Sequence, residues 1–586
     1  MTNDTPKYDP VVSPAQQVEA SLAEKKPAAA SEDGEPAAES DISEEAASLM
    51  QLIAKRDFAT PPELDKKNRP RFNKIDEILS YKPCHDHGNA ERFLERNKKK
   101  ILFVEKNGWF GWTGTHWAFE DGERRAQKAA YNTAIEMKKE SLAYAARGMY
   151  DGEKPGDYIE RIGKFRKFAH TSCNLSKLNA MLEIAETYVA REHDIMDTHK
   201  YLVTVGNGIL NLMPKGDPGK VQLDKHDPDK FISKKMEVDY DPDARCEKFE
   251  AALAQILPDP EIRKFLQTWY GYSLCGSVAS KAILIMQGEG DNGKSLLVEL
   301  FNRIFGNYAC GIPIESLMAQ KNKSGSNASP DLARLPGARV VTAAEPDQGM
   351  QFSEGFLKTI SGADKITVRR LHQDFFEFYA QFKLAIACNA KPQVRGGDEA
   401  LWKRLYLIPF EQQFLAEHRL PNPKPANVHK ADPELAAALW EERNGILNWM
   451  IKGFHDWKRD GLRMPEKMQA AVDEYRAENN TVLQFLQTWC DLTPGFCSER
   501  ATDLFDAYEL WAKEFAIEPM GKVGFGKKIK TLPNIKYERT GLGIFYGGVS
   551  LKDDAKAKLL AIRSGGARHA GEKAAAASLG EEEDIR

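Results

Sequence analysis

The chain lacks any apolar run of about 18 residues, the minimum for a membrane-spanning helix, and its acidic N-terminal stretch lacks the apolar core of a secretion signal. It also lacks paired C-x-x-C spacing, since its eight cysteines are scattered along the sequence. Scattered cysteines are typical of free thiols in a reducing compartment. These absences predict a soluble, cytoplasmic protein that has no membrane partner.

Metal-ligand patterns and a strong net charge are also missing. Cys84, His85 and His87 lie close together, but no second ligand pair follows at zinc-finger spacing. This favours a solvated loop over a metal site. The net charge is only −4, so any affinity for nucleic acid has to come from local basic patches.

With 586 residues, the chain is too long for one core, and about 150 residues per domain predicts three or four units. We see no internal repeats. Residues 1–70 are rich in Ala, Glu, Pro and Ser and are expected to be disordered, and residues 553–586 are predicted to form a second disordered tail. Between them we place a mixed α/β region over 71–250, a nucleotide-binding region over 251–475 and a C-terminal module over 476–552.

The most informative motif is the sequence G-x-x-x-x-G-K-S at 288–295. An aliphatic stretch at 282–286 precedes it and a segment of helical periodicity at 296–305 follows it, which is the context of a phosphate-binding loop. Backbone amides and the helix N-terminus would hold phosphates, Lys294 would reach the β- and γ-phosphates, and the Ser295 hydroxyl would bind Mg²⁺. A glycine turn that binds nothing is the alternative. The predicted nucleotide-binding residues are Gly288, Glu289, Gly290, Asp291, Asn292, Gly293, Lys294 and Ser295.

Two later segments predict buried strands that end in polar residues. The stretch 338–344 ends at Glu345, a carboxylate that could hold Mg²⁺ through water and polarise the attacking water. The stretch 384–388 ends at Asn389, whose carboxamide can accept from that water and donate to the γ-phosphate. A turn-forming asparagine is the alternative interpretation of this position.

Arg404 precedes a third apolar stretch, at 406–410. An arginine at this place could be a simple surface charge. It could also project into the nucleotide site of a neighbouring subunit as an arginine finger.

Basic residues surround a short β pattern between Glu345 and Asn389. A Gly-Ala-Asp turn precedes the pattern, and a hairpin there could direct cations toward phosphodiester groups. As a bare charge run, the same segment is more often a solvated face. The candidate DNA-facing residues are Lys358, Lys365, Arg369, Arg370 and His372.

The order of these elements resembles that of superfamily 3 helicases, the AAA+ type motors of viruses, phages and plasmids. The shared elements are the loop, the strand ending in Glu, the Lys-x-x-x-Gly-x-Asp hairpin, the strand ending in Asn and a Trp-Lys-Arg sequence at 402–404. The likeness is closest to the C-terminal ATPase of phage and plasmid primases and to the poxvirus-type primase-helicase. Segments 207–212 and 238–244 before the motor, and 446–465 after it, extend the resemblance to roughly residues 80–550.

The resemblance implies an α/β fold, with an AAA+ type P-loop ATPase core behind a mixed, helix-rich N-terminal domain. It also implies hexameric rings that enclose DNA, with ATP and Mg²⁺ bound between subunits. Residue by residue, it assigns the phosphates and Mg²⁺ to Gly293, Lys294 and Ser295.

Four further roles follow from the resemblance. Glu345 would act on Mg²⁺ and water, with Asp347 as an additional candidate. Asn389 would sense the γ-phosphate. Arg404 would be the finger, with Lys403 and Arg395 as alternatives. Lys358 and the 365–372 hairpin would face DNA.

The C-terminal module has the pattern of a winged helix, in agreement with the family likeness. Helical segments begin at 482, 501 and 523, and strand-like segments follow at 535–537 and 544–546. Lysines and arginines are concentrated on the third helix and the ribbon, including Lys527 and Lys528. Such a helix can enter a DNA major groove, although a winged helix can equally dock a protein.

The paired carboxylates that a primase needs are not evident. Asp239 and Asp241 offer the spacing, but Pro242 would disrupt a central strand. The sequence therefore predicts an ATP-dependent replicative DNA helicase of a phage, prophage or plasmid in a bacterial host cytoplasm, and no primer synthesis by this chain. A separate primase and other replication proteins are candidate partners. An origin-melting initiator and a bifunctional primase-helicase are the alternatives.

Overall fold

The computed structural model describes residues 72–216, 219–319, 330–344, 350–370, 374–394, 399–493, 497–515, 517, 519–532 and 535–563. All of them belong to one compact unit that begins at Phe72. The disorder predicted for residues 1–70 concerns residues outside these ranges. Within the ranges, none of the helices combines the length and the apolar character needed to cross a bilayer.

Residues 72–191 form a mixed domain in which helices pack around a small sheet of order β3-β2-β1-β4. Strands β1 and β2 pair antiparallel and form a hairpin rich in aromatic residues. Trp109 packs edge-on against Phe93 and Phe103, with ring centroids 6.0 and 5.2 Å apart. The elements are α3 (Lys74–Leu79), α4 (Asp86–Arg96), β1 (Ile101–Val104), β2 (Gly108–Trp112), β3 (Trp117–Ala118), α5 (Gly122–Ala146), α6 (Pro155–Thr171), α7 (Leu175–Val189) and β4 (Ala190–Arg191).

The cysteine and histidine cluster lies at the start of α4. His85 Nδ1 accepts a hydrogen bond of 3.2 Å from the Gly88 amide and so caps the helix. His87 Nε2 lies 3.0 Å from the Tyr188 hydroxyl. Among the described residues, no group of three potential ligands could hold a metal ion.

A second small sheet, of order β5-β6-β7, and two helices lead into the nucleotide-binding region. The sequence Pro258-Asp259-Pro260 separates the helices, because the Asp259 side chain accepts from the amides of Glu261 and Ile262 and Pro260 begins the second helix. The elements are β5 (Leu202–Val205), β6 (Gly208–Asn211), β7 (Gln222–Asp224), α8 (Glu247–Ile256) and α9 (Pro260–Ser273). Short 3-10 turns lie at His193–Ile195, Pro228–Lys230, Gly306–Tyr308, Ile314–Leu317, Leu332–Arg334 and Glu417–Arg419.

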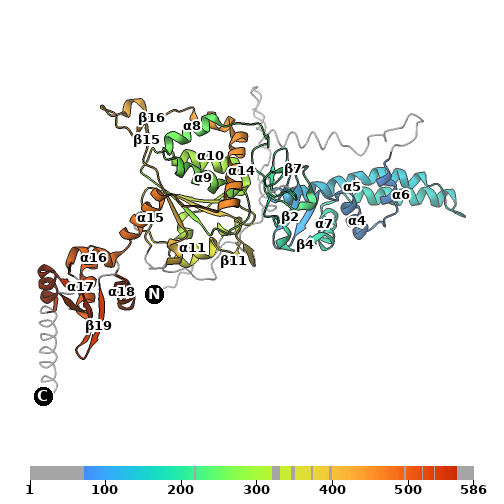
Figure 1. The fold of residues 1–586 in the computed structure, drawn as a ribbon. Coiled ribbons are helices and arrows are strands. Elements are labelled where there is room, and N and C mark those ends of the chain that lie inside the picture. The colour runs from blue at the N-terminus through green and yellow to red at the C-terminus, as the bar shows by residue number, and fades with distance from the viewer. Residues whose placement is uncertain are drawn as a thin grey trace, which may run out of the picture. The chain divides into compact units, whose positions relative to one another are not determined.

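The centre of this region is a sheet of five parallel strands in the order β14-β8-β13-β10-β9. Helices cover both of its faces, with α9, α10 and α14 on one side and α11 on the other (Figure 1). Double coverage explains why its strands are short and almost wholly aliphatic. The strands are β8 (Ile283–Gln287), β9 (Ala309–Gly311), β10 (Val340–Ala344), β13 (Lys383–Cys388) and β14 (Leu405–Pro409).

Helices and short strands surround this sheet. They are α10 (Lys294–Phe305), α11 (Glu354–Ile360), β11 (Lys365–Arg369), β12 (Phe375–Tyr379), α12 (Glu399–Trp402), β15 (Gln413–Leu415), β16 (Val428–Lys430), α13 (Leu435–Glu441), α14 (Arg443–Asp460) and α15 (Glu466–Glu478).

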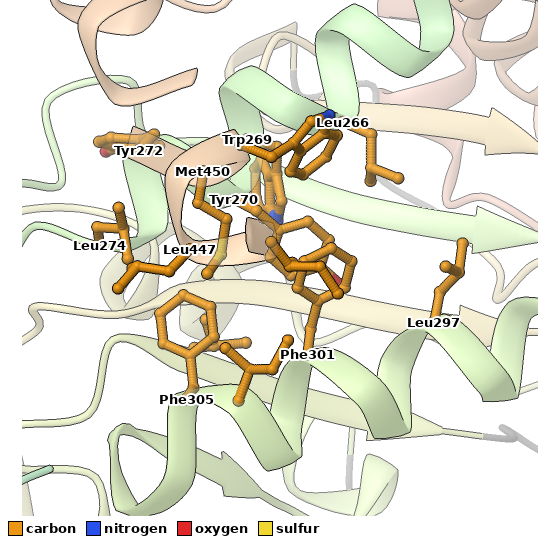
Figure 2. Packing of buried hydrophobic residues seen from close by; sticks show 14 of the residues in the cluster. Leu266, Trp269, Tyr270, Tyr272, Leu274, Leu297, Phe301, Phe305, Leu447 and Met450 are labelled. Carbon is orange, nitrogen blue, oxygen red and sulfur yellow. The ribbon is translucent and has the colours of Figure 1, made fainter. Parts of the chain in front are cut away.

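Alternate residues of strand β8 enter two different cores. Leu284 and Met286 belong to the cluster shared with α9, α10 and α14, whereas Ile283 and Ile285 belong to the cluster on the opposite face. In the first cluster, Tyr270 of α9 stacks on Phe301 of α10 with ring centroids 3.5 Å apart (Figure 2). Burying a side chain of this size contributes about 1.5–3 kcal/mol. Because α10 begins at the phosphate loop, this packing holds the loop's helix on the sheet.

Helices α9 and α14 cross closely because each carries a glycine at the contact. A Cβ on Gly271 would overlap the Phe454 amide, and one on Gly453 would overlap the Gln267 carbonyl. Only glycine allows two helix backbones to approach this closely.

Two cations are buried at the amino edge of the central sheet. The Lys383 ammonium donates to the Cys275 carbonyl and lies 4.3 Å from the centre of the Tyr272 ring. Arg339 donates to Gln381 Oε1 at 2.8 Å and to the His199 carbonyl at 3.0 Å. Burial lowers the pKa of Lys383 from 10.5 to about 7 and also lowers the pKa of Arg339.

The depressed pKa of Lys383 predicts a specific pH dependence of stability. Between its folded pKa of about 7 and its unfolded value of 10.5, the unfolded chain binds a proton that the folded chain lacks. The free energy of unfolding should therefore rise as pH rises through that window, and fall as pH falls toward 7. We expect the urea midpoint to increase from pH 7 to about pH 8.5, and to increase less in Lys383→Met.

The difference between the two proteins isolates Lys383, because every other titrating group is common to both. Buried thiols such as Cys246 and Cys490, whose pKa burial raises, oppose the trend only near and above the ordinary thiol value of 9. Identical slopes in the wild type and in Lys383→Met would contradict the assignment.

The C-terminal module is a helical unit with short strands and its own core around Phe485, Tyr508 and Phe525. It contains the three helices and the β-ribbon that the sequence predicts. The elements are α16 (Thr481–Trp489), β17 (Cys490–Leu492), β18 (Ser498–Arg500), α17 (Ala501–Glu514), α18 (Lys522–Ile529), β19 (Lys536–Thr540), β20 (Gly543–Gly547) and β21 (Val549–Leu551).

The structure differs from the disordered tail predicted to begin at residue 553. Residues 553–563 are helical, and Ala555 and Leu559 are buried in the core of the C-terminal module. The alanine- and charge-rich composition concealed this helix, because two apolar residues at i and i+4 are enough to attach it. The module therefore extends beyond the predicted boundary at 552, and residues 564–586 lie outside the described ranges.

Candidate nucleotide-binding site and DNA-facing surfaces

The predicted phosphate loop connects β8 to α10 in the strand–loop–helix arrangement that the motif requires. Gly293, which immediately precedes α10, has φ 82°, a left-handed conformation that favours glycine. A Cβ on Gly288 would overlap the Phe410 carbonyl. The two motif glycines are thus required by backbone geometry as well as by the pattern.

The Lys294 side chain is buried, with 6% of its surface exposed, and lies inside the curve of the loop. Its ammonium donates to the Gly288 carbonyl and to Asn389 Oδ1, the latter at 3.0 Å. Asn292 supports the loop, because its Oδ1 accepts from the Lys294 amide at 3.2 Å and its Nδ2 donates to the Glu289 carbonyl. Ser295 follows Lys294 in the first turn of α10 and is exposed to solvent.

Asn389 reaches Lys294 because β13 lies next to β8 in the sheet. Cys388 pairs with Gln287, and the Gln287 side chain donates to the Asn389 carbonyl at 3.2 Å. The carboxyl ends of these parallel strands therefore bring together two residues that are 95 positions apart in the sequence. Crevices at the carboxyl ends of parallel strands are where open α/β sheets bind ligands.

Strand β10 lies on the other side of β13, with Ala344 paired to Ala387. Ala344 is the last described residue of β10, so the predicted Glu345 and the alternative Asp347 lie outside the described residues. The same edge of the sheet contains the phosphate loop and Asn389. The predicted role of Glu345 therefore remains a prediction.

A segment that the sequence did not indicate also contacts the loop. The Phe414 amide of β15 donates to the Asp291 carbonyl at 2.6 Å, and Arg419 pairs with the Asp291 carboxylate at 3.1 Å. Asp291 has φ 59°, an uncommon value for a non-glycine residue. No motif marks residues 413–419, so only the packing shows that they support the loop.

Arg404 lies at the amino end of β14, the opposite edge of the sheet from the phosphate loop. Its guanidinium donates to the Lys358 carbonyl at 2.6 Å and to Ser361 Oγ at 2.9 Å, at the C-terminal end of α11. The five residues of β14 span about 15 Å, so Arg404 does not reach the loop of its own subunit. Lys403 is exposed beside it, and Arg395 lies outside the described residues.

The predicted basic hairpin is formed by β11 and β12, which pair antiparallel from Lys365↔Tyr379 to Arg369↔Phe375. Its residues alternate between a buried apolar face and the opposite face, which carries the exposed Lys365, Phe375 and Tyr379 and the half-buried Arg369. Lys365 pairs with Glu377 at 3.2 Å and lies 5.8 Å from the centre of the Tyr379 ring. Because aromatic rings lie beside its cations, this face differs from a simple run of solvated charges.

The other predicted DNA-facing residues occupy different environments. Arg370 donates to Asn107 Oδ1 at 2.9 Å and to the Lys106 carbonyl at 3.1 Å, so its guanidinium is used within the protein. Burial lowers its pKa. Lys358 is half-buried on α11, and His372 lies outside the described residues.

In the C-terminal module, the two predicted contacts on α18 differ in exposure. Lys527 is exposed, whereas Lys528 is half-buried, and burial lowers the pKa of Lys528. Lys527 is therefore the better placed of the two for a phosphate contact.

The Asp239 and Asp241 pair lies in an irregular segment, outside the strands of the described residues. The Asp239 amide donates to Asn444 Oδ1 at 3.1 Å, and Asp241 Oδ1 accepts from the Asp243 amide at 3.0 Å. These contacts give both aspartates a role in the connection before α8. The arrangement differs from the paired carboxylates on a strand that a polymerising site requires.

Comparison with protein families gives two matches along this chain. Residues 90–258 match the family described as D5 N terminal like, and residues 286–404 match a family of unknown function (DUF5906). The second match begins in β8 and ends at Arg404, and so covers the phosphate loop and Asn389.

Three viral relatives illustrate the similarity. "Putative helicase L207/L206" of Acanthamoeba polyphaga mimivirus is 25% identical over 447 residues, which are 73% of this chain and 46% of the relative. "Putative helicase 022R" of Frog virus 3 is 28% identical over 304 residues, or 50% of this chain and 30% of the relative. "Putative primase C962R" of African swine fever virus is 24% identical over 241 residues, or 41% and 24% of the two chains.

Among solved structures, the apo structure of the NrS-1 C terminal region covers 53% of this chain and 78% of its own, with 13% identity and a TM-score of 0.33. The chain spans less than half the length of each of the three viral relatives. The sequence matches support a D5-like primase-helicase relationship. The predicted phage, prophage or plasmid origin, and with it the bacterial host, stay predictions.

Proposed function

We propose that this chain is an ATP-dependent DNA helicase motor of the superfamily 3 type, with an AAA+ core and a ring-shaped, hexameric assembly. The observation that carries the proposal is the 3.0 Å contact between the Lys294 ammonium and Asn389 Oδ1 at the carboxyl edge of a parallel sheet. A phosphate-loop lysine next to a polar residue at the end of the adjacent strand is suited to γ-phosphate chemistry. The viral relatives named as helicases and primases support the same class.

The residues of the loop fit a triphosphate. Gly288 and Gly293 allow the tight loop conformation in which backbone amides could face the phosphates, and the N-terminus of α10 adds its partial positive charge. Lys294 would exchange its contacts with Gly288 and Asn389 for phosphate oxygens, and Asn389 would orient the attacking water. Ser295 and Glu345 would hold Mg²⁺, which neutralises charge on the phosphates when bound.

The position of Arg404 supports an assembly in which subunits share sites. It lies at the opposite sheet edge from its own loop, so a triphosphate that it contacts would have to be bound by another copy of the chain. This arrangement suits a finger that acts on the neighbouring subunit. In this proposal, charge developing at the γ-phosphate is stabilised from both sides, by Lys294 of one subunit and by Arg404 of the next.

Two surfaces support DNA as the polymer that the motor moves on. The exposed face of the β11–β12 hairpin combines Lys365 and Arg369 with Phe375 and Tyr379, the mixture of cations and rings that binds single strands. The C-terminal module, which we interpret as a winged helix, presents Lys527 on α18. An origin-melting initiator would use the same module to read duplex sequence, and a bifunctional primase-helicase would add primer synthesis.

The proposal is tested by measuring ATP hydrolysis with and without single-stranded DNA, together with particle mass in a non-hydrolysable ATP analogue and unwinding of a labelled fork. We expect DNA-stimulated hydrolysis, a ring-sized particle and unwinding. A particle that stays monomeric and yet unwinds forks would refute the shared site. Tight, sequence-specific duplex binding without unwinding would favour the initiator, and ribonucleotide incorporation on a single-stranded template would establish a primase.

A further inference from the structure

The β19–β20 ribbon carries the most exposed large apolar side chain among the described residues, Leu542, with 79% of its surface exposed. Strand β19 is exposed along its whole length, and the ribbon extends away from α17 and α18 (Figure 1). Thr540 pairs with Gly543, so Gly541 and Leu542 form a two-residue turn at its tip. An apolar residue at the tip of a projecting ribbon has no role in the core of the module.

The tip is held in a defined position. The Arg500 guanidinium of the neighbouring strand β18 donates to the Leu542 carbonyl at 3.0 Å. The Leu542 amide donates to Thr540 Oγ1, and that hydroxyl donates to the Gly543 carbonyl, both at 3.3 Å. Gly543 has φ 129°, which other residues adopt only with strain. These contacts order the turn while the leucine side chain stays in solvent.

A surface that suits DNA leads from α18 to this tip. Val523, Lys527 and Lys530 are exposed at helical spacing on one face of α18, opposite the buried Phe525 and Ile529. The Lys530 ammonium lies 3.6 Å from the centre of the Tyr537 ring.

On the ribbon itself, the face that carries Tyr537 continues toward the tip. Tyr537 pairs with Tyr546, and Arg539 pairs with Ile544, so these four residues share one face. Tyr537 and Ile544 are exposed, at 43% and 38%. Cations and apolar groups thus alternate up to Leu542.

We infer that the β19–β20 turn is a strand-separation wedge, in which Leu542 stacks against the terminal base pair of a duplex at a fork. This inference rests on the proposed helicase function, and it adds a site that the motor itself does not supply. The cations of α18 and of the ribbon neutralise phosphates of the duplex arm, and the apolar tip replaces base stacking lost when the end pair opens.

The positive charge of this surface favours DNA as its ligand over an apolar protein partner. Lys527, Lys530 and Arg539 flank the apolar residues, and a nucleic acid offers both phosphates and stackable bases. A two-residue turn is also narrow enough to enter between the strands of an opening duplex. Inserted leucine side chains are one of the ways in which proteins unstack base steps.

The test uses the full-length chain and a fork with 2-aminopurine in the first base pair of the duplex. Without nucleotide, the wild type should increase the 2-aminopurine fluorescence, and Leu542→Ala should not. With ATP, Leu542→Ala should unwind the fork about tenfold more slowly, while its single-strand-stimulated ATP hydrolysis stays at the wild-type rate. Leu542→Met, which keeps an apolar tip, should retain most of the unwinding.

Leu560→Ala is the matched control, because Leu560 is an exposed leucine (64%) of the same module, away from the ribbon. Equal fluorescence and unwinding in Leu542→Ala and wild type would overturn the wedge, as would a wild type that leaves the fluorescence unchanged. The failure of the proposed function would be distinguishable from the failure of the wedge. A chain that hydrolyses no ATP but still opens the terminal base pair through Leu542 would support the wedge and refute the proposed motor.

Discussion

Lys294→Ala is expected to reduce ATP hydrolysis by about 100- to 1,000-fold, because it removes a preorganised positive charge from the place where charge develops on the γ-phosphate. The structure places this ammonium inside the loop, in contact with Gly288 and 3.0 Å from Asn389. The measurement is phosphate release at saturating ATP, with binding of a fluorescent ATP analogue measured in parallel.

Lys391→Ala is the matched control for this experiment. Lys391 lies two residues after Asn389, but its ammonium pairs with Glu478 at 2.6 Å, away from the loop. We expect the control to hydrolyse ATP at a rate close to that of the wild type. Wild-type hydrolysis by Lys294→Ala would refute the assignment of the loop, and equal losses in both variants would point to a general disturbance of the site.

Arg404→Ala is expected to lower hydrolysis by about 1,000-fold or more, the usual contribution of an arginine finger, while leaving ATP binding largely intact. Neither Arg404→Ala nor Lys294→Ala alone should support hydrolysis. A mixed assembly of the two should regain activity, because a subunit with an intact loop then meets a neighbour with an intact finger. This recovery follows only if the site is shared between subunits.

Two controls separate catalysis from folding. Arg404 also bonds the Lys358 carbonyl and Ser361 Oγ at the end of α11, so thermal unfolding of Arg404→Ala has to be measured beside its activity. Lys403→Ala, which removes the exposed neighbouring cation, should retain hydrolysis if Arg404 is the finger. Mixed assemblies that form and stay inactive would contradict a site shared between subunits.

The local pattern of the sequence predicted the elements around the candidate site well. The aliphatic stretches before the loop, before Glu345 and before Asn389 form β8, β10 and β13 in the structure. Parallel strands that are buried on both faces consist mainly of apolar residues, which is why the pattern identified them. Gly288 and Gly293 of the loop could be predicted for the same kind of reason, since a Cβ would overlap the backbone at the first and be strained at the second. These features depend on residues near one another in the chain.

Features that depend on distant residues could not be predicted in the same way. Nothing in the pattern of 413–419 marked its contact with Asp291, and nothing in the composition of 553–563 separated a packed helix from a tail. The burial of Lys383 and Arg339 is another case, because a lysine at the start of a strand is usually exposed. The partners of Asp291 and Lys383, for example, lie more than 100 residues away in the sequence.

By itself, the sequence determined the strand–loop–helix arrangement around the motif at 288–295 and predicted a phosphate loop there, and it named the polar residues that end the neighbouring strands. Only the tertiary structure decided which of those residues meet. The order of the sheet brings Asn389 to Lys294 and leaves Arg404 at the opposite edge. The physical reason is that hydrogen-bonded pairing of parallel strands is non-local, so side chains are brought together by sheet order and not by their spacing along the chain.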